Sequence, residues 1–173
     1  MAIQNEPKIK DDKMTNCLRS AIEQRAEWFY LMNDEAAKRG HDWEEYCRPA
    51  IFRCGCFRGD EMLENFKDKS DLKELAEYFM NHPNAKVFEK EIVESTDDVL
   101  IQHFYHCPLV AGWQKMTDDE ELIAKMCDVA MDGDRGMFSR IPGVDFILEG
   151  TVAEGKPYCR LILKKNKEEK AEE

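Results

Sequence analysis

The chain has 173 residues, enough for one domain with a hydrophobic core, and its 36 acidic and 25 basic residues give a net charge of −11. This charge repels phosphate backbones and anionic lipid surfaces, so neither nucleic acid nor a membrane is an expected partner. No apolar run is long enough to span a bilayer and no export signal is recognised, which predicts a cytoplasmic protein with its seven cysteines reduced.

The sequence predicts three segments of different character. Residues 1–13 are polar and show no periodicity, so we expect a flexible tail. Residues 14–165 carry the periodic apolar pattern and should form a single domain. Residues 166–173 alternate in charge and are expected to be a disordered tail.

The N-terminal half of the domain is predicted to be helical. Apolar residues recur at helical spacing from Thr15 until a glycine ends the run. A second, shorter helix is expected to begin at Asp42 and to be limited by Pro49. Ser70 or Asp71 has the character of an N-cap and should open a third helix.

After Pro83 the apolar period changes from about 3.6 to 2, which indicates strands. The expected strands are 86–94, 99–106, 144–150 and 157–164. Two helices are expected between the hairpins, one starting at Pro108 and one N-capped by Thr117 and weakened by Gly133 and Gly136. The fold class is therefore α+β, with a helical N-terminal half packed on an antiparallel sheet built from two hairpins.

The segment FYHCPLVAGW, residues 104–113, places a thiol where a strand meets a helix. Pro108 suits the first helical position, which puts Cys107 at the N-cap, where backbone N–H groups and the helix dipole can lower the pKa of a thiol. Either His106 or His103 could assist it, but at most one is expected to face it. We predict that Cys107 is a nucleophile, with a buried structural cysteine as the alternative.

A second group of reactive side chains lies in CDVAMDGDRG, residues 127–136. Helical spacing puts Cys127 and Asp134 on one face, about two turns apart, with Asp128 and Arg135 on the flanks. A carboxylate here could act as a general base, and the guanidinium could bind a substrate carboxylate through two hydrogen bonds. The alternative is that Cys127 is a core residue and that the charged residues form a solvated helix end.

Cys159 alternates in phase with the apolar residues of the last strand and should face the core. If Cys107, Cys127 and Cys159 converge, three thiols with His106 or His103 could bind zinc or iron. None of the three belongs to a CxxC pair, so the sequence leaves the cofactor open.

The CxC motif around Gly55 is a weaker metal-binding signal, because no second cysteine pair accompanies it. The glycine between the two thiols is more simply interpreted as a sharp turn. We therefore assign no role to Cys47, Cys54 and Cys56.

Three blocks together suggest a family: HCPLVAGW at 106–113, CDVAMDGDRG at 127–136 and YCRLILKK at 158–165. In this order and spacing, residues 85–165 resemble the L-2-amino-thiazoline-4-carboxylic acid hydrolases. Their name-giving activity opens a cyclic thiazoline by adding water across the C=N carbon, which gives a carbamoyl-cysteine. The site implied by the resemblance consists of His106, Cys107, Cys127, Asp128, Asp134 and Cys159.

These observations lead to a first hypothesis, a small hydrolase that cleaves a C–N or C–S bond of a small heterocycle or amidine. Cys107 or a metal-bound water would be the nucleophile, and His106 or Asp134 the proton donor. Cys127 would complete the catalytic group. Arg135 and Asp128 would bind the substrate.

The second hypothesis is a non-catalytic module that binds a metal or cofactor, with Cys107, Cys127 and Cys159 as ligands. A third is a scaffold without activity. The aromatic residues Trp28, Phe29 and Tyr30 would permit a homo-oligomer interface, but they would equally suit a core.

Overall fold

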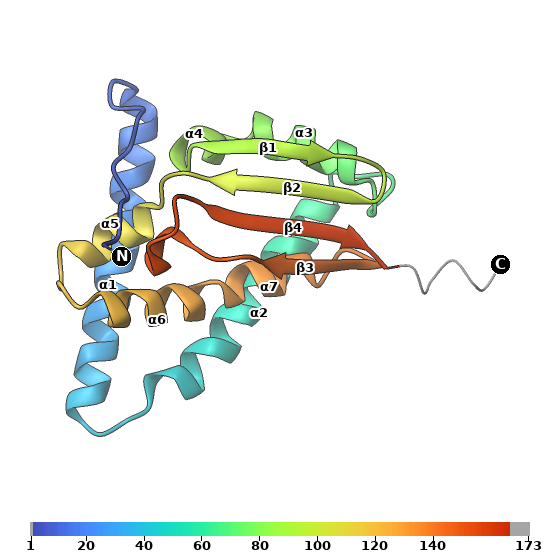
Figure 1. Ribbon diagram of the computed structural model, residues 1–173. Coiled ribbons are helices and arrows are strands. Elements are labelled where there is room, and N and C mark those ends of the chain that lie inside the picture. Colours follow the sequence, from blue (N-terminus) through green and yellow to red (C-terminus); the bar gives the residue numbers. More distant parts are fainter. Residues whose placement is uncertain (1, 167–173) are drawn as a thin grey trace.

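The computed structural model describes residues 2–166, and it confirms an α+β fold with a four-stranded antiparallel sheet. Helices cover one face of the sheet, and α1 and α2 lie outermost, beyond the shorter helices α5 to α7 (Figure 1). The helices are α1 (Lys13–Lys38), α2 (Trp43–Leu63), α3 (Leu72–Asn81), α4 (Asn84–Val87), α5 (Pro108–Gln114), α6 (Glu120–Ala130), α7 (Asp132–Phe138) and the 3₁₀ turn η1 (Val152–Glu154). The strands are β1 (Lys90–Ser95), β2 (Val99–Phe104), β3 (Val144–Leu148) and β4 (Cys159–Lys165).

The sheet has the strand order β1-β2-β4-β3, so the two predicted hairpins are joined through β2 and β4. Its register pairs Lys90 with Phe104 and Phe104 with Cys159, which puts these three side chains in one row on the helix-covered face. Gln102 pairs with Leu161 in the next row on the same face. The row of Lys90 is important for the candidate site described below.

The second helix does not end at Pro49, contrary to the sequence prediction. Helix α2 continues through this proline to Leu63, so the CxC motif is helical and Gly55 marks no turn. The glycine serves close packing instead, because a Cβ atom at position 55 would overlap the backbone carbonyl of Gly133 in α7. Extensive contact between α2 and α7 stabilises the helix and offsets the hydrogen bond that Pro49 removes.

The long helix expected after Thr117 is divided into α6 and α7, and its N-cap is Asp119, whose carboxylate accepts a hydrogen bond from the backbone N–H of Leu122. Gly133 and Gly136 do not mark a fraying end. Both lie in α7, and Gly136 lets the backbone of α2 approach closely. These glycines therefore position α7, the helix that carries Asp134.

Residues 2–12, expected to be a flexible tail, form an extended segment that contacts the domain. Asn5 is buried, and its side chain accepts a hydrogen bond from Cys107 N and donates one to Cys107 O, both at 2.8 Å. Glu89 Oε1 accepts hydrogen bonds from the backbone of Lys8 and Ile9. The segment thus holds the backbone at Cys107. The tail expected at 166–173 lies, from residue 167 on, outside the described residues.

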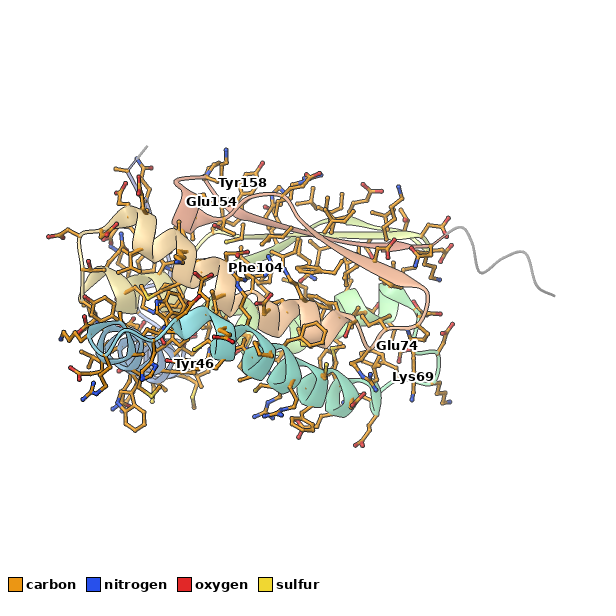
Figure 2. All side chains as sticks on the ribbon, turned by 90° about the horizontal axis from the view of Figure 1, so that it is seen from below. Tyr46, Lys69, Glu74, Phe104, Glu154 and Tyr158 are labelled. Carbon is orange, nitrogen blue, oxygen red and sulfur yellow. The ribbon has the colours of Figure 1, made fainter. Side chains whose placement is uncertain are left out.

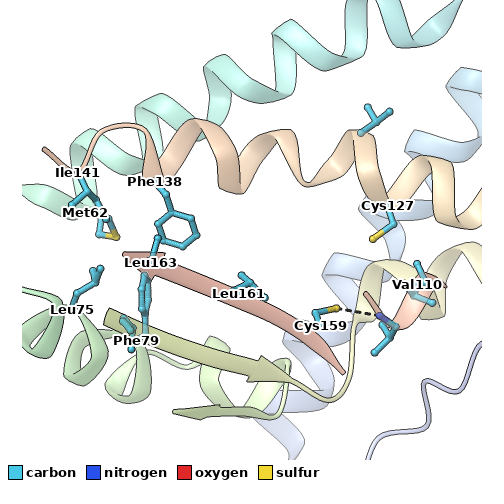
Figure 3. Close-up of a cluster of buried hydrophobic side chains, with 14 of the residues drawn as sticks. Met62, Leu75, Phe79, Val110, Cys127, Phe138, Ile141, Cys159, Leu161 and Leu163 are labelled. Atoms are coloured by element: carbon cyan, nitrogen blue, oxygen red, sulfur yellow. Dashed lines mark hydrogen bonds between the residues drawn. The ribbon is translucent and has the colours of Figure 1, made fainter. Parts of the chain in front are cut away.

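The core lies between the sheet and the helices, and Figure 3 shows part of it. Aromatic and aliphatic side chains such as Phe79, Phe138 and Leu163 fill one end, and Cys127 and Cys159 lie at the other. Within residues 2–166, no helix combines the length and the apolar composition that crossing a bilayer requires.

Candidate active site

Cys107 is the N-cap of α5, as the sequence predicts, but its thiol is not activated. Burial raises the pKa of Cys107, and nearby Asp134 raises it further, although the backbone N–H groups of Val110 and Leu109 act in the opposite direction. The expected lowering of the pKa is therefore not found, since desolvation outweighs the start of this short helix. At neutral pH the thiol is protonated and needs a base to become a nucleophile.

Cys107, Cys127 and Cys159 converge, although they come from three different elements. Figure 3 shows the buried thiols of Cys127 on α6 and Cys159 on β4 directed into the same interior region. Burial raises the pKa of Cys127, and the charges of the other two thiols raise it further. Burial and the charge of Cys107 raise the pKa of Cys159 to about 12. The three sulfur atoms are therefore within electrostatic range of one another.

This convergence does not form a metal-binding arrangement. Among residues 2–166, no group of three or more His, Cys, Asp or Glu side chains has the geometry to hold a metal ion. The ligand set Cys107, Cys127 and Cys159 of the second hypothesis is thus not assembled in the described structure. Val152 N instead donates a hydrogen bond to Cys159 Sγ at 3.4 Å.

Asp134 and Lys90 are half-buried and act electrostatically on each other, and Asp134 also acts on the thiols of Cys107 and Cys159. Burial raises the pKa of Asp134 to about 6, although the positive charge of Lys90 lowers it. Burial lowers the pKa of Lys90 to about 8, and Asp134 acts against this shift. At neutral pH both groups are mainly charged, yet each can exchange a proton at low cost, as general acid–base catalysis requires.

Aromatic rings enclose the ammonium group of Lys90. Its Nζ lies 4.4 Å from the ring centroid of Phe104 and 5.0 Å from that of Phe79. Figure 2 shows Phe104 in the layer between the sheet and helices α6 and α7. The rings exclude water from Lys90, which explains its lowered pKa.

Gln102 contributes an unsatisfied acceptor to the same face. Its side chain is 1% exposed, and its Oε1 has no hydrogen-bond partner within the described part of the chain. Because an unpaired buried acceptor costs about 1–3 kcal/mol, such a group marks a place where a ligand can bind. We call the following group the inner-face site: Lys90, Gln102, Cys107, Cys127, Asp134 and Cys159.

His106 and His103 do not belong to this site. His106 Nδ1 lies 2.7 Å from the backbone oxygen of Asn5, and its ring lines a separate cleft of about 700 Å³ between residues 3–10 and α1. Burial lowers the pKa of His106. His103 stacks on Tyr158 on the other side of the sheet, with ring centroids 3.8 Å apart. Neither imidazole faces the thiols, which corrects the role that the sequence suggested for His106.

Asp128 and Arg135 also lie elsewhere than predicted, in an ion-pair network near the surface. Arg135 pairs with Asp128 and with Asp132, each at 2.6 Å, and Arg48 pairs with Asp128 at 2.7 Å. The guanidinium of Arg135 is therefore occupied. A different cation, the exposed Arg25 of α1, acts electrostatically on both Cys107 and Asp134 and has no ion-pair partner within residues 2–166.

Sequence reasoning missed Lys90, Gln102 and Arg25. A signal for the first two was present, because strand alternation puts Gln102 in phase with Leu100 and Phe104, and Lys90 in phase with Ile92. No comparable signal marks Arg25, since exposed arginines on helices are common.

Comparison with known proteins extends the resemblance seen in the second half of the chain. No curated protein matches the sequence. The family model for L-2-amino-thiazoline-4-carboxylic acid hydrolase matches residues 19–163 and so includes the helical N-terminal half. At the level of the family, this match supports a hydrolase function. The chain belongs to the L-2-amino-thiazoline-4-carboxylic acid hydrolase family.

Proposed function

We propose that the protein hydrolyses a small cyclic amidine that carries a carboxylate, of the thiazoline type, in the inner-face site. The observation that carries this proposal is the half-buried Asp134, which acts electrostatically on both Lys90 and the thiol of Cys107. Addition of water to a C=N carbon needs a nucleophile, a base to activate it and an acid to protonate the nitrogen. The three residues supply these functions.

The first step forms a bond between Cys107 and the substrate. The carboxylate of Asp134 accepts the thiol proton, and the sulfur attacks the amidine carbon. The electron pair of the C=N bond moves to the nitrogen, which takes a proton from the ammonium group of Lys90. The C–S bond of the ring then breaks, and the departing ring sulfur takes the proton held by Asp134. Water attacks the same carbon and gives one proton to Lys90. The bond between this carbon and Cys107 breaks, Cys107 leaves as a thiol with the second water proton, and the net change is the addition of one water molecule.

Two further residues would orient the substrate. Gln102 Oε1 is a buried acceptor without a partner in the described residues and can accept a hydrogen bond from the amidine N–H. Arg25 is an exposed cation that acts electrostatically on both Cys107 and Asp134, and within residues 2–166 its guanidinium is in no ion pair, so it can bind the substrate carboxylate. Arg135 is unsuited to this task because its donors already bind carboxylates.

The direct test is turnover of L-2-amino-thiazoline-4-carboxylate, followed by mass spectrometry of the carbamoyl-cysteine product. Replacing Cys107 by serine should abolish turnover, whereas the same replacement at Cys17, an exposed thiol on α1, should leave it unchanged. Asp134→Asn should lower kcat about 10²–10⁴-fold, the usual contribution of a general base. Full activity of both Cys107→Ser and Asp134→Asn would show that the reaction does not use this site.

The pH dependence provides a second test. The reaction needs Asp134 deprotonated and Lys90 protonated, so kcat/KM should rise through about pH 6 and fall through about pH 8. Asp134→Asn should remove the acidic limb of the residual activity. We also propose that the protein acts in the cytoplasm, which its seven free cysteines support.

A further inference from the structure

A cleft of about 700 Å³ lies between residues 3–10 and helix α1, and its volume is in the usual range for small-molecule sites. In Figure 1 the N-terminal segment runs beside α1 to α5. No residue of the inner-face site lines this cleft, so it is separate from the site proposed above. Outside residues 3–10, the lining residues are Asn16, Arg19, Ser20 and Glu23 of α1, together with His106, Ala111 and Gln114.

His106 contributes an unsatisfied nitrogen atom to the wall of this cleft. The residue is 2% exposed, and its Nε2 has no hydrogen-bond partner among residues 2–166. A buried polar atom without a partner is destabilising and rare in native proteins, so it marks a place where a ligand can bind. The proposed reaction does not use this atom.

The hydrogen bond of the other ring nitrogen determines what Nε2 can bind. Nδ1 of His106 lies 2.7 Å from the backbone oxygen of Asn5, and since a carbonyl oxygen only accepts hydrogen bonds, Nδ1 carries the proton. Burial lowers the pKa of His106, so the ring is neutral at neutral pH. In this tautomer Nε2 presents a lone pair, and it needs a partner that donates a hydrogen bond.

The charges of the lining argue against an anionic ligand. Its carboxylates, Glu6 and Glu23, are equal in number to its cations, Arg19 and Lys10. The guanidinium of Arg19 donates to three backbone oxygen atoms as well as to Glu89, so it offers little to an anion. The net charge of −11 also disfavours anions over the whole molecule. The ion pairs at the cleft are Arg19 with Glu89 at 3.1 Å, Lys10 with Glu6 at 3.6 Å, and Lys115 with Glu23.

We propose that this cleft binds a small alcohol or amine, whose hydroxyl or amino group donates a hydrogen bond to Nε2 of His106. Apolar lining residues such as Ile9 and Ala111 would contact the hydrocarbon part of the ligand. The carboxylate of Glu23 and the hydroxyl of Ser20 are further acceptors for a polyol or an ammonium group. This binding goes beyond the proposed function and does not depend on it.

Long-range ¹H–¹⁵N correlation spectra of the full chain with ¹⁵N-labelled histidine test the proposal. At about 10 mM, benzyl alcohol or benzylamine should shift the Nε2 signal of His106, while its Nδ1 signal remains that of a protonated nitrogen. Benzyl methyl ether is the matched control, because it has the same ring but no group that donates, and it should leave the Nε2 signal unchanged. The compound with the higher affinity identifies the donor group. If neither donor compound shifts the signal, or if the ether shifts it equally, the proposal is overturned.

Two variants separate the role of His106 from that of the cleft, with affinity measured through the proton signals of the bound compound. His106→Asn keeps an N–H group for the backbone oxygen of Asn5 but lacks the acceptor, so the donor compound should bind at least roughly fivefold more weakly. Ser20→Phe fills the cleft from an exposed position on α1, so binding should be lost even if His106→Asn does not fold. Ala21→Phe, at the next exposed position, lies outside the lining and should bind as the wild type does. Wild-type affinity in Ser20→Phe, or in a folded His106→Asn variant, would contradict the proposal.

Discussion

Replacing Gly136 by alanine is expected to destabilise the protein, although alanine normally stabilises a helix. Gly136 lies in α7 at its closest approach to α2. A Cβ atom at this position would overlap the carbonyl oxygen of Phe52 and come within 2.9 Å of its carbonyl carbon and 3.1 Å of Cys56 N. These are backbone atoms, which cannot rotate away as a side chain could. The helices would have to separate.

The expected size of the effect follows from two opposing contributions. In a helix interior, alanine makes the folded state about 1 kcal/mol more stable than glycine does, whereas overpacking of a close contact makes it about 1–3 kcal/mol less stable, or more. Because the clash involves backbone, we expect the upper end, which leaves a net loss of about 2 kcal/mol. For a domain of this size the melting temperature should fall by roughly 4–8 °C.

Gly133, in the same helix, provides the matched control. Its added Cβ would lie 3.5 Å from Ile51 Cγ2, an ordinary van der Waals contact, so Gly133→Ala should be neutral or stabilise by up to about 1 kcal/mol. Urea denaturation of the wild type and both variants measures the difference. If Gly136→Ala is as stable as the wild type, or if both variants lose the same stability, the packing argument is refuted.

Three further predictions concern the interior and the N-terminal segment. The raised pKa of Asp134 makes the folded state less stable as the pH rises from about 4 to about 6. In urea denaturation, Asp134→Asn should therefore stabilise the protein by up to about 3 kcal/mol at pH 8 and by nothing near pH 4. Equal effects at both pH values would contradict this. Arg19→Met should cost about 3–5 kcal/mol in the same assay, since it leaves Glu89 as a buried, unpaired charge, and adding Glu89→Gln should recover part of the loss. Asn5→Ala should cost about 1–3 kcal/mol and speed the reaction of the Cys107 thiol with a disulfide reagent, because it removes two hydrogen bonds to the Cys107 backbone; an unchanged rate would show that the segment does not protect this thiol.

Features that depend on neighbouring residues were predictable from the sequence. The strand pairing of the two hairpins, the N-cap at Asp71 and the start of α5 at Pro108 agree with the structure, since alternation, capping and proline preference act over a few residues. The first expected strand, 86–94, begins too early, because its first two residues belong to α4 and β1 starts at Lys90. The prediction that Pro49 ends the second helix is wrong because it considers only neighbouring residues. The hydrogen bond that proline removes is a local cost, whereas the packing of α2 on α7 that offsets it involves residues far apart in the chain.

The same distinction between local and long-range effects applies to the residues of the candidate site. Helical and strand periodicity placed Cys127, Asp134 and Cys159 on inward faces, and in the structure each of the three interacts electrostatically with Cys107. Periodicity could not show which way His106 points, because that depends on Asn5, about a hundred residues earlier in the chain. Nor could it show that Asp128 and Asp132 already bind the guanidinium of Arg135.

The sequence by itself determined the α+β class, the order of most elements, the family resemblance and the thiol at the start of α5. Only the tertiary structure decided that this thiol is protonated and that Lys90 and Asp134 lie beside it. The physical reason is that desolvation and charge pairing depend on distances between segments far apart in the chain, whereas periodicity, capping and turn formation depend on neighbours.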